Sequence, residues 1–279
     1  MPPRCTGAAS LGTLPPVLAA DGITLTYGNR AVLHNVDVSL APGEVVALIG
    51  PNGAGKTSLI RALIAVVPST GAVRWFDRRL ADWPRRALAR RVAYLPQVPT
   101  ADAGQRVIDV LRLGRTPYGG PFGLESHRDA AVVADVAAEL GLTDLLDRPL
   151  DELSGGQRQR AFLGRCLAQE PSALLLDEPN TYLDLRHQVE LCQRLRRLAA
   201  DRQLGVLMAV HDLTLAALFA DRVVLLVEGR VAAAGPPADV LTAAAISAAY
   251  GLPLVRLSGP NNRPVLVPAM YGDSPDPAS

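Results

Sequence analysis

The chain has 279 residues, of which 49% are hydrophobic and 20% charged, and its formal net charge is +1. A chain of this length and composition can bury a core without disulfide or metal staples, which excludes a disordered, collagen-like or coiled-coil protein. Its near-neutral charge provides no overall field for nucleic acid or an anionic membrane surface. The three cysteines, Cys5, Cys166 and Cys192, are odd in number and widely spaced. They predict neither a disulfide framework nor a zinc site, and they fit a reducing, cytosolic setting.

No apolar run approaches the roughly 20 residues that a membrane-spanning helix needs, and the longest, such as Val223 to Val227, have the length of a strand. The first 20 residues carry one arginine and an apolar stretch that glycine and prolines interrupt, which makes a poor export signal. A chain of this kind that works at a membrane has to dock onto an embedded partner.

Strand-like and helix-like patterns alternate along the chain. The expected strands are 23–27, 36–40, 45–49, 73–76, 92–95, 173–176 and 206–210, with a further pair around Glu228-Gly229. The expected helices are 56–67, 185–200 and 213–220, and the stretch from about 106 to 168 is mainly helical. Strands separated by helices predict an α/β fold with a mostly parallel sheet, an antiparallel β region near the N-terminus and an inserted helical subdomain.

The expected domain boundaries follow from these patterns. Residues 1–17 are expected to be a flexible segment, and 18–258 one domain with the helical subdomain inserted at about 98–153. Residues 259–279 are rich in Pro, Asn, Asp and Ser and are expected to be disordered.

A phosphate-binding loop follows the apolar run that ends at Ile49. Residues 50–57 match G-x-x-x-x-G-K-[ST] and open a helix, which is the context that this motif requires. The residues expected to hold the phosphates are Gly50, Pro51, Asn52, Gly53, Ala54, Gly55, Lys56, Thr57 and Ser58. In such a loop backbone N–H groups surround the phosphates, the lysine adds a full charge on the β- and γ-phosphates, and the Thr57 hydroxyl is a ligand for Mg²⁺. The sequence therefore predicts a P-loop NTPase with ATP and Mg²⁺ as cofactors.

Two acidic residues end the apolar run Ala173 to Leu176. Ligands of parallel sheets bind at the carboxyl ends of the strands, so Asp177 is predicted to lie on the Mg²⁺ side of the nucleotide. Glu178 points elsewhere because it is adjacent, and is predicted to polarise the attacking water. An acidic helix N-cap pair is the structural alternative.

The sequence resembles the ATP-binding-cassette (ABC) ATPases over roughly 18–257. The string Leu153-Ser154-Gly155-Gly156-Gln157 matches that family's signature and opens a helix. Its N-terminal N–H groups form a second anion site without a lysine. The resemblance implies a head-to-tail dimer in which ATP lies between the phosphate loop of one copy and Ser154, Gly155, Gly156 and Gln157 of the other.

The resemblance also assigns roles to four residues outside these motifs. It implies that Tyr27 stacks on adenine, although a tyrosine packing on the core is the alternative. It implies that Gln97 senses Mg²⁺ and water and that His211 contacts the γ-phosphate and orients the catalytic carboxylate. Asp184 belongs to the loop that crosses the dimer interface. The sequence departs from the family at Asn180, where a threonine is expected, and this puts only local loop geometry in doubt.

Several branches of the family are excluded. The stretch from Gly55 to Ser154 leaves no room for the long coiled coil of the chromosome and repair branch. The chain holds one cassette, unlike the translation factors with two, and it has no membrane helices of the kind that fused exporters carry. What remains is a motor subunit for separate integral membrane permease subunits, indirectly served by an extracytoplasmic substrate-binding protein, at the cytoplasmic face of the membrane. Further strings resemble the branch that imports iron(III)–siderophores, haem and cobalamin. These strings are 113–118, 182–188, 210–213, 220–222, 238–242 and 249–251. A zinc or manganese importer and a soluble ATPase without a transport role are the alternatives.

Overall fold

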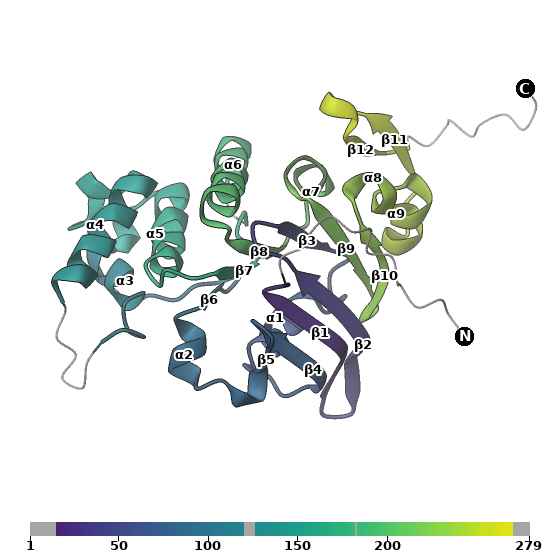
Figure 1. Cartoon of the computed structure of the whole chain (residues 1–279). Coiled ribbons are helices and arrows are strands. Elements are labelled where there is room, and N and C mark those ends of the chain that lie inside the picture. The colour runs from purple at the N-terminus through teal and green to yellow at the C-terminus, as the bar shows by residue number, and fades with distance from the viewer. Residues whose placement is uncertain (1–14, 120–125, 182, 270–279) are drawn as a thin grey trace, which may run out of the picture.

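The computed structural model describes residues 15–119, 126–181 and 183–269 (Figure 1). At the centre of the described part of the chain lies a six-stranded sheet with the strand order β10-β9-β3-β8-β7-β6. Its strands are β3 (Val45–Ile49), β6 (Val92–Leu95), β7 (Ala173–Asp177), β8 (Gly205–Ala209), β9 (Arg222–Val227) and β10 (Arg230–Gly235). All neighbours pair in parallel except β9 and β10, which confirms the expected α/β fold with a mostly parallel sheet.

The strands β3, β7 and β8 are buried at every residue. Near-continuous apolar runs are typical of parallel strands that helices cover on both faces. Because the three strands run side by side in parallel, the residues that follow them meet at one edge of the sheet. Those residues are Gly50 after β3, Glu178 after β7 and Val210-His211 after β8.

A second sheet lies on the N-terminal side, with antiparallel strands in the order β2-β1-β4-β5. Its strands are β1 (Leu18–Tyr27), β2 (Arg30–Leu40), β4 (Thr70–Trp75) and β5 (Arg78–Arg79). This confirms the antiparallel region. The prediction that residues 1–17 are flexible was wrong for Val17, which is buried, donates its N–H to the Leu40 carbonyl at 2.8 Å and accepts from Phe76 at 3.0 Å. Residues 1–14 lie outside the described part of the chain.

The helices cover both faces of the central sheet and extend to one side of it (Figure 1). They are α1 (Lys56–Leu63), α2 (Arg85–Ala89), α3 (Val107–Leu113), α4 (His127–Leu140), α5 (Gly155–Leu167), α6 (Leu185–Arg202), α7 (Leu213–Phe219), α8 (Pro237–Val240) and α9 (Ala243–Tyr250). Short 3₁₀ turns lie at Leu80–Asp82, Thr143–Leu145, Leu150–Glu152 and Pro260–Asn262. None of the helices described is long and apolar enough to cross a membrane.

The helix α1 ends four residues before the predicted Val67. Ala65 adopts φ 56°, and its N–H bonds to the Ala62 carbonyl at 3.1 Å while the Val66 N–H bonds to Arg61 at 2.9 Å. This pair of bonds is the Schellman arrangement that ends helices, here with alanine in the left-handed position that glycine usually takes. The apolar pattern continues past the turn, which is why periodicity alone overextended the helix.

The helices α3, α4 and α5 form the layer at the left of Figure 1 and pack against one another. Their buried side chains, such as Leu111, Val136 and Phe162, share one hydrophobic cluster with Leu176 of β7. The layer is therefore joined to the central sheet through a continuous core.

The C-terminal segment differs from its prediction. The strands β11 (Leu254–Ser258) and β12 (Pro264–Pro268) form an antiparallel hairpin, so the expectation of disorder from 259 onward was wrong for the described residues to 269. Arg263 Nη1 donates to the carbonyls of Ala217 at 3.0 Å and Ala220 at 3.2 Å, at the end of α7. The strand β12 has apolar residues between its two prolines and contacts α7. The abundance of Pro, Asn, Asp and Ser in this segment gave no indication of that contact. Residues 270–279 lie outside the described residues.

Candidate nucleotide site

The phosphate loop turns directly from β3 into α1. Gly50 has φ 147°, and a Cβ atom placed on it would lie 2.0 Å from the Leu226 carbonyl oxygen on β9. A side chain is excluded there by both backbone conformation and space. Gly55 is the N-cap residue of α1, so the first N–H groups of this helix open toward the loop, as an anion site requires.

Lys56 is the single lysine of the chain, because the other 27 basic residues are arginines. Its side chain is 5% exposed, and Nζ donates to the carbonyls of Gly50 at 2.7 Å and Pro51 at 3.1 Å. Burial lowers the pKa of Lys56, while the nearby carboxylates of Glu178 and Asp177 oppose that shift. The loop thus holds a buried ammonium group whose neutral carbonyl partners are weaker acceptors than phosphate oxygens.

Asp177 and Thr57 lie together below the loop. The Thr57 hydroxyl donates to Asp177 Oδ1 at 2.9 Å, and the Asp177 side chain has no exposed surface. Burial raises the pKa of Asp177 and the Glu178 charge adds to the rise, whereas the Thr57 hydrogen bond opposes it. One hydroxyl and one carboxylate are hard oxygen ligands, so these residues fit Mg²⁺ held jointly with nucleotide phosphates.

Tyr94 is a site residue that sequence reasoning missed. It lies on β6, and its hydroxyl donates to Asp177 Oδ2 at 3.5 Å. Burial raises the pKa of Tyr94, which keeps its hydroxyl a donor. The available signal was a polar residue within a short apolar strand next to β7, but only the strand order of the sheet places it beside Asp177.

Glu178 lies at the centre of a three-residue cluster. It accepts a hydrogen bond from Gln97 Nε2 at 2.6 Å on Oε2, and His211 Nε2 lies 2.5 Å from Oε1. The Glu178 side chain is 9% exposed and that of His211 is 45% exposed. Each carboxylate oxygen of Glu178 therefore lies within hydrogen-bond distance of one side-chain nitrogen, from Gln97 or from His211, and this fixes the orientation of the carboxylate.

The backbone explains how adjacent acidic residues separate. Glu178 adopts φ 52°, in the left-handed region, and its N–H donates to the Ala209 carbonyl of β8 at 3.1 Å. The chain thus leaves β7 abruptly after Asp177. One carboxylate lies against Thr57 and the next against Gln97 and His211, as the sequence predicted for their different directions. A left-handed glutamate is a strained conformation of the kind that concentrates at functional sites.

A cavity of about 390 Å³ lies over the phosphate loop. It is lined by Tyr27, Arg30, Val32, Glu178 and residues 52–58. Tyr27 is 45% exposed at the end of β1, so its ring is not a core residue. Arg30 and Val32 of β2 were not singled out from the sequence, because only the β1–β2 pairing brings them to this cavity.

The tip of α5 is a separate, solvent-facing feature. Ser154 is the N-cap, its Oγ accepts from the Gln157 N–H at 3.3 Å, and Gln157 Oε1 accepts from the Ser154 N–H at 3.0 Å. Ser154 and Gly155 are exposed, and none of the residues 154–157 lines the cavity over the phosphate loop. A Cβ atom on Gly156 would lie 2.9 Å from the His187 ring, so the glycine permits α6 to approach this tip.

Asp184 begins α6 beside that tip. Its Oδ1 accepts from the His187 N–H at 2.9 Å and lies 2.8 Å from His187 Nδ1. In the preceding loop Asn180 is buried, and its carbonyl accepts from the Leu183 N–H at 3.2 Å. The loop is thus closed by backbone bonds that an asparagine at 180 provides as well as a threonine. Residue 182, part of one string compared above, lies outside the described residues.

Comparisons with known proteins identify the family of the chain. The sequence profile of the family described as ABC transporter matches residues 33–181. The chain is 45% identical over 250 residues to the hemin import ATP-binding protein HmuV of Streptomyces coelicolor, covering 89% of this chain and 88% of that one. It is 34% identical over 250 residues to the iron(3+)-hydroxamate import ATP-binding protein FhuC of Bacillus subtilis, covering 89% and 93%.

Among solved structures, a chain of a metal-chelate type ABC transporter in an inward-facing conformation superposes with a TM-score of 0.81. The match covers 92% of this chain and 98% of that one at 24% identity, so it concerns the fold. The ATP-binding cassette MJ1267 of an ABC transporter, in its ADP conformation, superposes with a TM-score of 0.77, and the match covers 85% of this chain and 99% of that one at 23% identity.

Proposed function

The chain belongs to the ABC transporter family, and from that premise we propose that it is the ATP-hydrolysing subunit of an importer for an iron chelate. ATP binding and hydrolysis are the activity of this family of ATPases. The import role and the substrate class are proposed from the named relatives, which are ATP-binding proteins of hemin import and of iron(3+)-hydroxamate import.

The observation that carries the ATP-hydrolysing role is the arrangement of three groups around one cavity. Lys56 lies within the phosphate loop, Thr57 bonds to Asp177, and Glu178 is held between Gln97 and His211. Phosphoryl transfer needs a charge on the phosphates, oxygen ligands for a cation and an oriented group at the attacking water. The described residues include a group suited to each of the three, which supports the proposal.

In the proposed mechanism, Glu178 orients the attacking water and accepts its proton while the water oxygen bonds to the γ-phosphorus and the bond from that phosphorus to the leaving ADP breaks. The hydrogen bonds from Gln97 and His211 keep that carboxylate in one orientation, so it needs little reorganisation during the reaction. Thr57 and Asp177 would hold Mg²⁺, which supplies positive charge to the phosphate oxygens. Lys56 exchanges its loop carbonyls for β- and γ-phosphate oxygens, which are stronger acceptors.

The tip of α5 supports a head-to-tail dimer. Ser154 and Gly155 are exposed and lie outside the cavity of their own chain, although the helix N-terminus presents backbone N–H groups suited to phosphate. A two-fold arrangement allows each copy to complete the other's site with one set of residues. We propose that Ser154, Gly155, Gly156 and Gln157 contact ATP bound to the partner copy, with Asp184 at the interface.

Coupling to transport requires that this chain bind an integral membrane permease at the cytoplasmic face of the membrane. In this proposal the helical region of about 98–153 moves with dimer closure, and Gln97 at the end of β6 joins that region to Glu178. An extracytoplasmic substrate-binding protein would deliver the chelate to the permease without contacting this chain.

Complementation tests this function. Cells lacking the gene are grown with a single iron source in each culture, such as hemin or a hydroxamate siderophore. They should fail to grow on the chelate that the protein helps to import, and the wild-type gene should restore that growth. Glu178→Gln should be expressed and membrane-associated yet fail to restore growth. Equal growth of the deletion strain on every iron chelate, with loss of zinc or manganese uptake instead, would contradict the substrate class. A chain that never co-purifies with an integral membrane protein would contradict the transport role.

A further inference from the structure

Arg30 borders the nucleotide cavity but has no part in the hydrolytic cluster. It begins β2, is exposed, and lines the cavity of about 390 Å³ together with Tyr27, Val32 and Lys56. Within the ranges that the structure describes, its side chain forms no hydrogen bond, ion pair or ring contact. A cationic side chain therefore lies at the edge of the nucleotide cavity with all of its N–H donors available.

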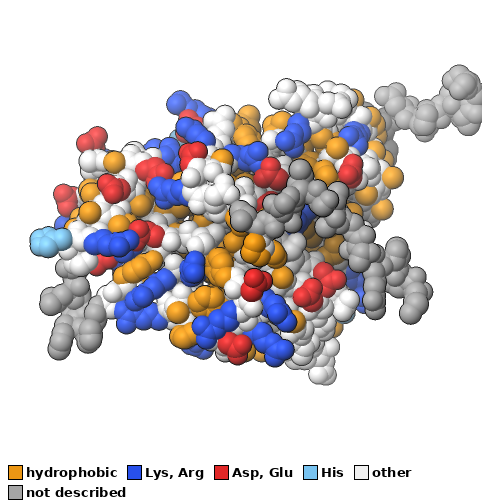
Figure 2. All heavy atoms as spheres, viewed as in Figure 1, with side chains coloured by type: hydrophobic (Ala, Val, Ile, Leu, Met, Phe, Trp, Pro, Cys, Tyr) orange, Lys and Arg blue, Asp and Glu red, His pale blue; other side chains and the backbone are white. Residues whose placement is uncertain are grey.

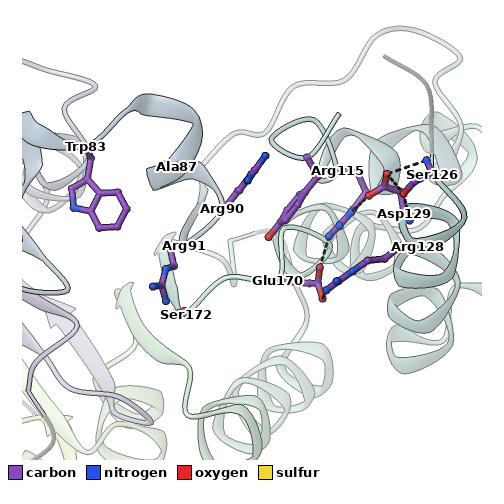
Figure 3. A pocket seen from close by; sticks show the side chains of 11 residues that line it. Trp83, Ala87, Arg90, Arg91, Arg115, Ser126, Arg128, Asp129, Glu170 and Ser172 are labelled. Carbon is purple, nitrogen blue, oxygen red and sulfur yellow. Dashed lines mark hydrogen bonds and ion pairs between the residues drawn. The ribbon is translucent and has the colours of Figure 1, made fainter. Parts of the chain in front are cut away.

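Two arginines that line a second cavity are, by contrast, held by carboxylates. This cavity, of about 770 Å³, lies away from the phosphate loop (Figure 3). Arg115 lies 2.7 Å from Asp129 and 2.8 Å from Glu170. Arg128 shares Glu170 at 3.3 Å. Figure 2 likewise shows acidic side chains among the basic ones on one face of the molecule. Arg30 has no carboxylate of this kind, so its donors are open to the acceptor atoms of a ligand.

The place of Arg30 along β2 separates it from the phosphates. A Cβ atom on Gly55, the last glycine of the loop, would lie 3.2 Å from the Val32 carbonyl oxygen, so β2 passes the loop at Val32. Arg30 is two residues away on the same strand, and therefore about 7 Å from Val32 and on the same face. The ribose and the α-phosphate separate the base of a nucleotide from its β- and γ-phosphates. A nucleotide with these phosphates in the loop therefore places its base toward Arg30.

Tyr27 supplies the other half of this end of the cavity. Tyr27 and Arg30 are partners in the β1–β2 register, so their side chains project from the same face of the sheet, opposite each other. A base that stacks on the Tyr27 ring presents its edge to a side chain beside that ring. Stacking accepts every base, because each base has a π-face, so Tyr27 gives no discrimination between bases. Discrimination depends instead on the donors of Arg30.

We propose that the chain also binds and hydrolyses 6-oxopurine nucleoside triphosphates, such as GTP and ITP, and that Arg30 recognises the O6 and N7 edge of their base. This inference rests on the proposed function, because it concerns the nucleotide substrate of the same site. Guanidinium donors fit O6 and N7 as a pair, whereas adenine offers N7 beside an amino group that is itself a donor. An arginine at this place therefore favours a 6-oxopurine over adenine.

The hydrolytic step is the same for either purine. The water oxygen bonds to the γ-phosphorus, the bond from that phosphorus to the leaving GDP breaks, and Glu178 accepts the proton of the water. Lys56, Thr57 and Asp177 act on phosphates that GTP shares with ATP. The identity of the base therefore changes the dissociation constant and KM and leaves kcat unaltered.

Calorimetry of the full chain with Mg²⁺ and each nucleotide tests this contact. The wild-type chain should bind GTP and ITP about 10-fold more tightly than ATP, which is the lower part of the range that a paired guanidinium contact gives. ITP lacks the 2-amino group of guanine but keeps O6 and N7, whereas 7-deaza-GTP lacks N7. We therefore expect ITP to bind as tightly as GTP and 7-deaza-GTP to lose most of the preference.

Two substitutions at Arg30 separate its geometry from its charge. Arg30→Ala removes both, and Arg30→Lys keeps a charge without the paired donors. Each should raise the dissociation constants of GTP and ITP to that of ATP, and each should raise the KM for GTP while kcat is unchanged. Arg197→Ala, on the exposed surface of α6, is the matched control and should change none of these values.

The alternatives give different results. Equal losses of affinity for ATP, GTP and inorganic tripolyphosphate in Arg30→Ala would show that Arg30 attracts phosphates, and would overturn the inference. Unchanged affinities in both Arg30 variants would overturn it too, and would leave Arg30 as a charge that protects the edge strand β2. Equal binding of GTP and 7-deaza-GTP would remove the contact with N7. A wild-type chain that binds ATP but not GTP overturns the inference alone, whereas one that binds neither nucleotide overturns the proposed function as well.

Discussion

Replacement of Glu178 by glutamine removes one charge while nearly preserving shape. The wild-type carboxylate offers two acceptor oxygens, which meet Gln97 Nε2 at 2.6 Å and His211 Nε2 at 2.5 Å. A glutamine side chain offers one oxygen and one amino group, so only one of the two nitrogens, Gln97 Nε2 or His211 Nε2, still meets an acceptor oxygen. The loss of one such hydrogen bond costs about 0.5–1.5 kcal/mol of stability, which leaves the fold intact.

The catalytic loss should be larger than the loss of stability. Without an acceptor for the proton of the attacking water, hydrolysis should slow by about 10²–10⁴-fold, or about 3–5 kcal/mol of transition-state stabilisation. Lys56, Thr57 and Asp177 are untouched, so ATP binding should persist, and the dimer should accumulate in its closed form.

Single-turnover hydrolysis and ATP-dependent dimerisation on a sizing column measure the two effects separately. Gln97→Glu is the matched control for altered charge at the cluster, since it places a second carboxylate beside Glu178 and should slow hydrolysis through misorientation without trapping the dimer. Wild-type turnover in Glu178→Gln would refute the assignment of the water-orienting group. Loss of ATP binding in that variant would show that the residue acts on the loop instead.

Three further predictions concern other parts of the molecule. Lys56→Ala should weaken ATP affinity about 10- to 100-fold, measured by calorimetry, because it removes a charge-assisted hydrogen bond; unchanged affinity would contradict it. Ser154→Arg should block ATP-dependent dimerisation but spare binding to the single chain, and loss of both would refute the cross-copy placement. Asp129→Asn should destabilise the chain by about 2–3 kcal/mol in urea unfolding at pH 7, because Arg115 keeps Glu170 but loses a buried partner. Hydrogen bonds from Ser126 and Arg115 lower the pKa of Asp129 from 3.8 to about 2, so its stabilisation is present above about pH 5 and disappears as pH falls toward 2; a variant deficit that stays constant over that range would contradict this origin.

The local motifs were readable without a structure because each is complete within one short segment. The phosphate loop needs only a strand, glycines and a helix start in succession, and the α5 tip needs only an N-cap serine with a glutamine three residues later. The adjacent Asp177 and Glu178 were likewise predicted from the end of an apolar strand. Gln97 and His211 came from family resemblance, since neither has a local chemical signal.

Contacts between distant segments depended on tertiary structure. The bond from Tyr94 to Asp177, the joint hold on Glu178, and the place of Arg30 in the cavity all follow from which strands are neighbours in the sheets. A second cavity likewise brings together Arg90 and Arg91 with Arg128, which β6 and α3 separate from them along the chain. Strand order is decided by the burial of whole apolar faces, an energy summed over many residues, so no short stretch of sequence encodes it. The sequence therefore determined which functional side chains the protein has, whereas the tertiary structure determined which side chains contact one another.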